Sequence, residues 1–499
     1  MINKKVLKIL ALAAAASMTI SATACLASTK KTDNTEDTAV QITADDIQTK
    51  EEITNSEDGA HAIEVSGETK EYKNVKVTKT GDSSQNDEAD FYGDNAAIFA
   101  TDKATLTLDN IIVDTNGTHA NAVFSYGEGT TVNISNSVIT TEGNCSGGLM
   151  TTGGGTMNAT NLNIHTTGNS SAAIRSDRGG GTVTVDGGTY VTDGTGSPVV
   201  YSTADITVSN AKMESTASEG VVVEGKNSVT LNNVDLTADN NKKNSDKSTN
   251  YEAVMIYQSM SGDASVGLAT FTMNGGTLTN KKGDIFFVNN TATTITIESA
   301  KIVNQDTSGV FLRAAAAGWG TEGSNGGKVN LYLKNQTQDG DIVVDKVSQL
   351  NMYLSDGSTY TGAINAANEG EVYVEIESGS KWILTGDSYV TSLTCGKDAI
   401  DLNGFKLYVG GAEYVAGTES EGSAIEIKSE GSGTGRPDGA PDGMPDGMPG
   451  DSPSVEKPSG ERPEGEKPEG VPQGDPPQGG PGNGEEPPAK PGEAQGNIN

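Results

Sequence analysis

Residues 183–233 read VTVDGGTYVTDGTGSPVVYSTADITVSNAKMESTASEGVVVEGKNSVTLNN, and this stretch contains the pattern that decides the fold. Three five-residue segments in it, VTVDG, ITVSN and VTLNN, begin at Val183, Ile206 and Val229, each 23 residues after the last. Each segment has apolar residues at its first and third positions and a turn-forming residue at its fifth. Because side chains of a strand alternate between two faces, the segment predicts a short strand with one buried face. The final Asn or Gly favours a corner with left-handed backbone.

The same segment recurs between residues 60 and 428, and nine of its eleven spacings lie between 21 and 26 residues. Each interval holds two further short β-like pieces, such as GTYVTD and SPVVYS after Val183. Three strands per coil with corners between them resemble the right-handed parallel β-helix, so we predict an all-β solenoid of this kind. The twelve segments begin at Leu106, Val132, Met157, Val183, Ile206, Val229, Phe271, Ile295, Leu331, Met352, Val374 and Ile400.

Composition divides the chain into unlike parts. Only 34% of the 499 residues are hydrophobic, which suits a thin solenoid core better than one thick globular core. Of the 16 prolines, 15 follow Ser429, in a segment with no aromatic residue. We therefore predict a signal peptide (1–24), a polar tether (25–59), the β-helix (60–428) and a disordered tail (429–499) rich in Pro, Gly and Glu.

The N-terminal segment predicts export. Three lysines precede the apolar run Ile9–Ile20, which is too short to span a bilayer and has the features of a secretory signal. The run ends in Ala22–Cys25 (ATAC), which resembles a bacterial lipoprotein box and implies lipidation of Cys25. Cleavage without lipidation is the alternative, because Ala22 stands where that box usually has leucine. We expect a cell-surface protein whose membrane attachment is this lipid anchor alone, or else a secreted one.

The net charge of −33 argues against nucleic acid as a partner, because counterion release cannot drive binding to another polyanion. The same charge argues against attraction to an anionic membrane surface. Cys145 and Cys395 lie about eleven coils apart, or ~50 Å at the strand spacing, which is too far for a disulfide. We expect both to be buried core thiols.

Two segments, NDEADFYGDNAAIFATDKATLTLDN (86–110) and SKWILTGDSYVTSLT (380–394), resemble segments of adhesin-like β-helix proteins of bacterial cell surfaces. Together with the coil repeats the resemblance covers about three quarters of the chain. These adhesin-like proteins share their fold with pectate-lyase-like enzymes. The resemblance implies non-catalytic binding of an extracellular polysaccharide or a host or cell-surface ligand, and it supplies no catalytic residue.

Two surfaces are candidate ligand sites. The second position of the repeat must point outward, and it is tyrosine in two adjacent coils, at Tyr332 and Tyr353, with Tyr373 close by. Such a strip can bind sugar rings or only stabilise the sheet. The other surface is a notch between two insertions, residues 258–268 and 314–327. Loops on a rigid scaffold commonly hold function, so the notch is a candidate ligand-binding cleft; the alternative is that both are tolerated surface insertions. The notch residues are Trp319, Tyr257, Arg313 and Asn290.

Acidic residues near the N-terminal end suggest Ca²⁺, which prefers oxygen ligands, although a solvated acidic loop has the same composition. The candidate ligands are Asp87, Glu88, Asp90 and Asp94. The three histidines, at 61, 119 and 165, share no metal-binding spacing, so no histidine metal site is expected.

A polysaccharide lyase or a glycoside hydrolase on the same fold is the rival function, and a structural spacer is the third. A lyase needs a basic residue beside a metal-binding carboxylate cluster. Arg175 and Arg178 flank Asp177, but an exposed ion pair at a corner explains them as well. A hydrolase needs two carboxylates about 5–10 Å apart, and no two acids of the repeat's fourth position fall on adjacent coils.

Overall fold

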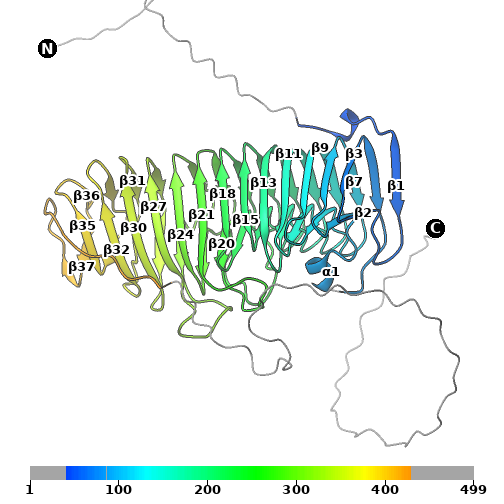
Figure 1. Cartoon of the computed structure of the whole chain (residues 1–499). Coiled ribbons are helices and arrows are strands. Elements are labelled where there is room, and N and C mark those ends of the chain that lie inside the picture. The colour runs from blue at the N-terminus through cyan, green and yellow to red at the C-terminus, as the bar shows by residue number, and fades with distance from the viewer. Residues whose placement is uncertain (1–40, 86, 429–499) are drawn as a thin grey trace, which may run out of the picture. The chain divides into compact units, whose positions relative to one another are not determined.

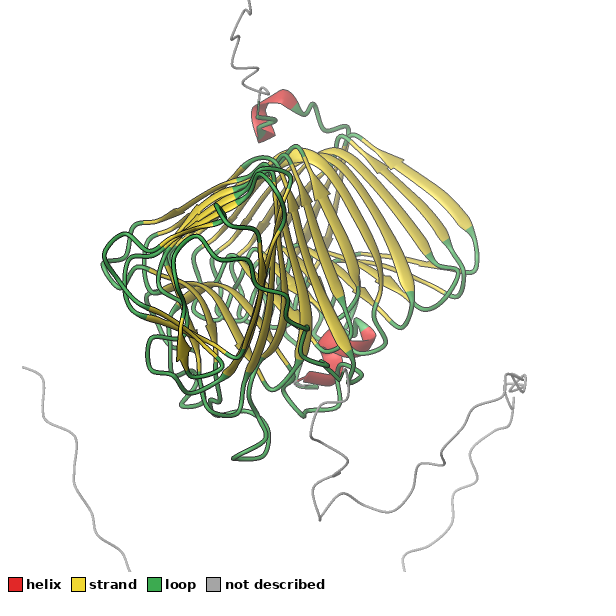
Figure 2. Cartoon of the chain, turned by 90° about the vertical axis from the view of Figure 1, so that its left-hand side faces the viewer, coloured by secondary structure: helices red, strands yellow, loops and turns green. Residues whose placement is uncertain are grey.

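The computed structural model describes residues 41–85 and 87–428. The predicted signal peptide, the lipidation site Cys25, the first part of the tether and the tail from residue 429 lie outside the described residues. The described chain winds into a stack of parallel strands (Figure 1), which enclose a narrow interior when viewed along the stack (Figure 2). It is a parallel β-helix with three strands per coil, as the sequence predicts. The helical elements within the described chain are η1 (Ala44–Asp46) and α1 (Asp87–Tyr92).

The five-residue repeats form one face of the stack, called here the repeat face. Their strands pair in parallel and in register, with Leu106, Val132 and Met157 side by side on successive coils. The strands of the repeat face are β3 (Thr69–Lys73), β6 (Thr105–Asp109), the first halves of β9 (Thr131–Thr141), β11 (Gly155–Thr166) and β13 (Gly181–Thr192), then β15 (Asp205–Ser209), β18 (Ser228–Asn232), β21 (Leu268–Asn274), β24 (Ala292–Glu298), β27 (Lys328–Lys334), β30 (Gln349–Ser355), β32 (Glu371–Ile376) and β35 (Ser392–Cys395).

The second face follows the repeat face in each coil, after the predicted corner. Its strands are β1 (Glu51–Asn55), β4 (Val75–Lys79), β7 (Ile112–Thr115), the second halves of β9, β11 and β13, then β16 (Lys212–Ser215), β19 (Asp235–Ala238), β22 (Thr277–Asn280) and β25 (Lys301–Asn304). In the last coils the strands that follow this corner form a separate 4-stranded sheet, of β28 (Thr337–Asp339), β31 (Thr359–Thr361), β33 (Lys381–Ile383) and β36 (Ile400–Asp401).

The third face completes each coil. Its 11-stranded sheet contains β2 (Ile63–Ser66), β5 (Ile98–Thr101), β8 (Val123–Tyr126), β10 (Leu149–Thr152), β12 (Ile174–Ser176), β14 (Val200–Ser202), β17 (Val221–Glu224), β20 (Glu252–Tyr257), β23 (Asp284–Asn289), β26 (Val310–Ala314) and β29 (Asp341–Val344). Near the end of the described chain, β34 (Ser388–Val390) pairs in parallel with β37 (Leu407–Val409), and β37 pairs antiparallel with β38 (Ala412–Glu413).

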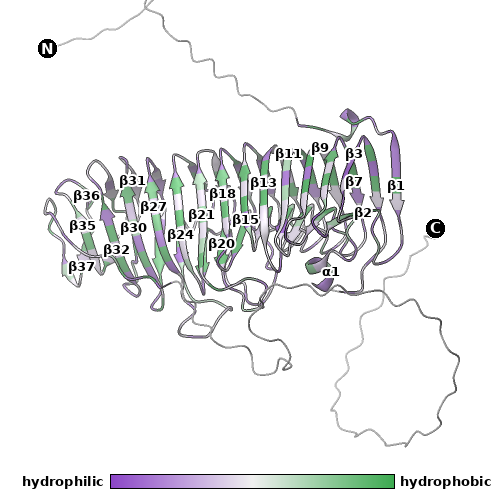
Figure 3. Ribbon diagram, viewed as in Figure 1, coloured by the Kyte–Doolittle hydropathy of each residue, from purple (hydrophilic) through white to green (hydrophobic). Residues whose placement is uncertain are grey.

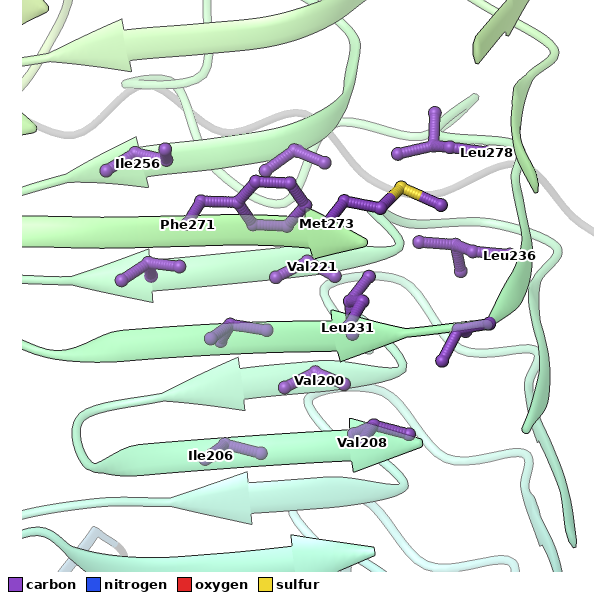
Figure 4. Packing of buried hydrophobic residues seen from close by; sticks show 14 of the residues in the cluster. Val200, Ile206, Val208, Val221, Leu231, Leu236, Ile256, Phe271, Met273 and Leu278 are labelled. Atoms are coloured by element: carbon purple, nitrogen blue, oxygen red, sulfur yellow. The ribbon is translucent and has the colours of Figure 1, made fainter. Parts of the chain in front are cut away.

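The core is a set of apolar columns, because the same inward positions recur on every coil. Hydrophobic and hydrophilic residues alternate along the repeat-face strands (Figure 3), and the inward ones are buried. Figure 4 shows Ile206 and Val208 of one coil below Leu231 of the next, with Val200 and Val221 opposite. Each coil therefore contributes only a few buried side chains, which accounts for the low apolar content.

The corners take the left-handed backbone that the fifth repeat position predicts. Asn110, Asn161 and Asn233 have φ angles of 52° each. The asparagines of successive corners bond to each other through their side chains. The Nδ2 of Asn161 donates to Oδ1 of Asn136 at 2.9 Å, and Asn233 bonds to Asn210 in the same way at 3.1 Å.

Two details of the structure differ from the sequence pattern. Strand β1 lies inside the predicted tether, because its polar sequence EEITN joins the first coil through main-chain pairing with β4. The last predicted repeat is misplaced, since Ile400 pairs with Trp382 on the second face, whereas Leu393 continues the repeat face beside Val374. The five-residue pattern describes a strand and a corner, and it does not specify the face.

Cys395 is buried as predicted, but Cys145 is only half-buried, at a corner with φ 55°. Within residues 41–85 and 87–428 no helix has the length and apolar content needed to cross a membrane.

Candidate functional site

The tyrosine strip forms as predicted. The rings of Tyr332 and Tyr353 stack at 4.6 Å with an angle of 8°, and Tyr373 meets Tyr353 edge-on at 6.0 Å. Tyr373 is buried, and its hydroxyl bonds to Glu375 and Thr394. Stacking covers one ring face of Tyr332 and one of Tyr353, so these faces are closed to a sugar. This arrangement favours the structural interpretation of the strip, and its role in binding stays a prediction.

The predicted notch brings two of its four residues together. Both insertions leave the third face and return to the repeat face, after β20 and β26, as predicted. Trp319 lies across the gap and meets the ring of Tyr257 edge-on at 5.1 Å. Buried Asn290 donates to the Gln258 carbonyl at 2.9 Å, while Arg313 pairs with Asp284 at 2.6 Å. Trp319 of one insertion thus contacts Tyr257 at the start of the other.

The third face has a property that the sequence reasoning missed. Its outward column is apolar over most of its length, and these apolar side chains are buried. Phe99, Phe124 and Met150 form one buried cluster, and Val222, Met255, Tyr257 and Phe287 form another, against which Trp319 packs. In the same column Arg175 and Tyr201 lie between the two clusters, on adjacent strands. The continuous apolar runs of these strands, such as AVMIY (253–257), were the available signal, because a strand covered on both faces loses its alternation.

A cavity of about 190 Å³ opens between these two clusters. Residues 239–251 form one of its walls and are a third long insertion. This insertion and residues 258–268 lie in the same long interval between two repeats, so the sequence analysis counted only one of them. Asn244 of this insertion packs against Gly196, where an added Cβ would lie only 2.4 Å from the Asn244 side chain. The cavity is lined by Ser170, Ala172, Arg175, Gly196, Pro198, Tyr201, Asn244 and Tyr257.

Arg175 is held in the wall of this cavity by two carboxylates. Its guanidinium contacts Asp177 at 2.8 Å and Asp90 of helix α1 at 3.3 Å. Burial disfavours the charge of Arg175, but Asp90 and Asp177 outweigh it and raise the arginine pKa. Burial also raises the pKa of Asp177, which is 4% exposed, to about 6, although Arg175 lowers it. The predicted corner ion pair exists, yet it is buried rather than solvated.

Two tyrosines of the cavity share a buried carboxylate. Glu224 is 1% exposed and accepts hydrogen bonds from the hydroxyls of Tyr201 and Tyr257, the latter at 3.2 Å. The Ser259 N–H also donates to it, at 3.3 Å. Burial raises the pKa of both tyrosines well above the ordinary value, with the charge of Glu224 as a further cause. Both hydroxyls therefore stay protonated as donors.

The two carboxylic acids nearest to the cavity do not line it. Asp177 and Glu224 contact Arg175, Tyr201 and Tyr257, which line the cavity, but the two carboxylates are not among its lining residues. A ligand in the cavity would meet a guanidinium and tyrosine rings. This arrangement fits binding and orientation better than proton transfer from a carboxylic acid.

The predicted Ca²⁺ ligands separate. Helix α1 buries Asp90, which pairs with Arg175, His119 and Asn121, while Glu88 is exposed and Asp94 accepts a bond from Ser83. Glu88, Asp90 and Asp94 do not converge on one point in the part of the chain that the structure describes. The side chain of Asp87 lies outside the described atoms.

A larger hollow of about 390 Å³ lies at the next corner. Its walls are glycine turns and polar surface residues such as Asp205, Lys226 and Asp263, and it has no aromatic lining residue. The smaller cavity is the better candidate site, because buried charges and tyrosine hydroxyls converge on it.

Over the described residues, these features define a parallel β-helix with a polar cavity on its third face. Comparisons with protein-family models, with curated proteins and with solved structures found no match.

Proposed function

We propose that this chain is a non-catalytic, adhesin-like binding protein of the bacterial cell surface, which holds part of an extracellular carbohydrate in the cavity beside Arg175. The observation that carries the proposal is the convergence of Arg175, Tyr201 and Tyr257 on a cavity of about 190 Å³. Cavities for drug-sized ligands begin at ~300 Å³, so this one suits a single small polar unit such as a terminal sugar. A guanidinium donor beside aromatic rings suits the polar edge and the apolar face of a sugar ring.

Export and anchoring belong to the same proposal. The apolar run before Cys25 supports secretion, and the ATAC sequence supports a lipid anchor at Cys25 as the sole membrane attachment. The charge of −33 supports a partner other than nucleic acid. In the producing bacterium, Cys25→Ser should move the chain from the membrane fraction to the medium. A variant that stays with the membrane would contradict the anchor without touching the cavity.

Asn244 offers a direct test of the cavity. The full chain is screened on a glycan array, and retention of the best glycan is then compared for Asn244→Ala and Asn250→Ala. Both asparagines lie in the insertion 239–251, but only Asn244 lines the cavity. We expect Asn244→Ala to weaken retention about tenfold, as loss of ~1.4 kcal/mol would, and Asn250→Ala to leave it unchanged. Equal retention by both variants would place the ligand elsewhere.

A glycoside hydrolase is the second candidate. The observation in its favour is the pKa of Asp177, raised to about 6 beside the cavity, which suits a general acid. Release of reducing ends from the retained glycan, abolished by Asp177→Asn, would favour this function over simple binding.

A further inference from the structure

Three side chains with different donor atoms meet at the corner between the second and third faces. Oxygen of Asp90, a ring nitrogen of His119 and sulfur of Cys145 all lie within 4.8 Å of one another. Asp90 and His119 are buried and Cys145 is half-buried. Sequence spacing did not predict this cluster, because the three residues are 29 and 26 positions apart and come from a helix and two successive coils.

His119 and Cys145 occupy equivalent positions on neighbouring coils. The next two coils place Ser170 and Gly196 there, and the four φ angles are 56°, 55°, 55° and 64°. Main-chain bonds from each coil to the next fix the register, with His119 N–H donating at 2.9 Å and Cys145 N–H at 2.8 Å. Glycine and asparagine suit this conformation best, whereas cysteine is strained in it.

Helix α1 delivers the third donor. Its residue Phe91 accepts a hydrogen bond at its carbonyl from Thr152 at 2.7 Å, and Arg178 lies over the Phe91 ring at 3.9 Å. The helix is therefore fixed to the third face, and Asp90, which is 2% exposed, points to the corner. An Asp90 oxygen lies 3.1 Å from Nδ1 of His119.

The surrounding charges fit a divalent ion. A carboxylate and a thiolate bring two negative charges, which one divalent cation neutralises, while the charge of Arg175 is matched by Asp177 at 2.8 Å. Asn121 donates to Asp90 at 3.1 Å, and Arg175 contacts the other oxygen at 3.3 Å. These contacts orient Asp90, as second-shell partners of metal ligands do.

We propose that Asp90, His119 and Cys145 bind a divalent transition-metal ion, and that Zn²⁺ is the ion best matched to them. Sulfur, imidazole nitrogen and carboxylate oxygen are the ligand types of zinc, and Ca²⁺ or Mg²⁺ would not take the thiolate. Zinc bonds of ~2.0–2.3 Å set tetrahedral ligand atoms ~3.3–3.8 Å apart, so small side-chain rotations close the site. Three protein ligands leave a fourth position for water or an external ligand. The Ser170 of the next coil lines the 190 Å³ cavity, which places the ion one coil from it.

The test uses the full mature chain, reduced and freed of metal. Co²⁺ is added first, because a cobalt–thiolate bond gives a charge-transfer absorption that carboxylates alone cannot give, and Zn²⁺ affinity is then measured by competition. The wild type should bind one Co²⁺ per chain with this absorption. Cys145→Ser should abolish the absorption and weaken Zn²⁺ binding at least ~100-fold, beyond the ~10–100-fold loss caused by removing a second-shell partner.

The variants are chosen so that the fold accepts them. Serine already stands at the equivalent position Ser170, so Cys145→Ser keeps a residue that this corner tolerates. His119→Asn places a residue suited to the left-handed conformation and should also abolish high-affinity binding. Cys395→Ser is the matched control, a thiol 250 positions away in the core, and it should bind as the wild type does. A wild type without the absorption, or Cys145→Ser with unchanged affinity, would overturn the proposal.

Discussion

Replacing Tyr201 with phenylalanine should lower the stability of the fold more than the loss of one oxygen atom suggests. The reason is that the Tyr201 hydroxyl donates a hydrogen bond to a buried carboxylate. The substitution keeps the ring and removes only the oxygen that donates to Glu224. Glu224 is 1% exposed, and its remaining donors are the Tyr257 hydroxyl at 3.2 Å and the Ser259 N–H at 3.3 Å. Hydrogen bonds to charged groups contribute ~1.5–3 kcal/mol, so Tyr201→Phe should lower the free energy of unfolding by about 2 kcal/mol.

Tyr190 supplies the matched control. Tyr190 is a buried core tyrosine, and its hydroxyl donates to a neutral acceptor, the Gly187 carbonyl, at 3.0 Å. Neutral hydrogen bonds contribute ~0.5–1.5 kcal/mol. Tyr190→Phe should therefore cost about 1 kcal/mol, and the difference between the two variants isolates the effect of the Glu224 charge.

The assay is native-state hydrogen exchange of the amides in β14 and β17, because long repeat arrays can unfold in parts and a single global transition would average them. Tyr201→Phe should raise exchange about thirtyfold in these strands, since ~1.4 kcal/mol is a factor of ten. A cost for Tyr201→Phe no greater than that for Tyr190→Phe would refute the view that a charged Glu224 organises the cavity.

Three further results are expected. The folded-state pKa of Asp177 is raised from 3.8 to about 6, so its stabilising contribution is complete below pH 3.8 and is lost as the pH rises through 6. At ~1.36 kcal/mol per unit the loss is about 3 kcal/mol, and Asp177→Asn should remove this slope from urea unfolding measured between about pH 4 and pH 7. Asn233→Ala should cost ~1–2 kcal/mol for its left-handed backbone plus the bond to Asn210, and more than Asn233→Gly in the same urea assay. Tyr353→Ala should lower the unfolding midpoint through the loss of a ring pair worth ~0.5–1.5 kcal/mol while glycan retention stays unchanged; lost retention would restore the strip as a binding surface.

The fold could be predicted from sequence because a solenoid repeats its local rules. Val183, Ile206 and Val229 are buried at equivalent places in successive coils, and the residue that closes each of these segments has a positive φ. The ends were predicted less well, since terminal coils pair on one side only. EEITN at residues 51–55 therefore needs no inward apolar pattern to form a strand.

The site was harder to predict, because it depends on contacts between coils. Tyr257 was identified for its place beside an insertion, yet its partners Tyr201 and Glu224 come from earlier coils and carry no local motif. Arg175 and Asp177 were recognised as an ion pair, but their burial follows from Asp90 on a helix that the repeat pattern does not encode. Sequence spacing likewise predicted no histidine metal site. His119 and Cys145 come to lie on neighbouring coils only when the chain folds, so their spacing in the sequence does not indicate that they meet.

A distinct functional site on a β-helix requires coils that differ from their neighbours, since identical coils present identical surfaces. On the third face the repeat is interrupted between two segments. Helix α1 packs on one side of this interruption, and insertion 239–251 lies on the other. Between these two segments the outward column changes from apolar side chains to Arg175 and Tyr201, which is where the cavity opens. Polar groups there are desolvated by their neighbours and held by strands paired on both sides, so they keep one geometry. On the repeat face, by contrast, the outward rings of Tyr332 and Tyr353 stack on each other.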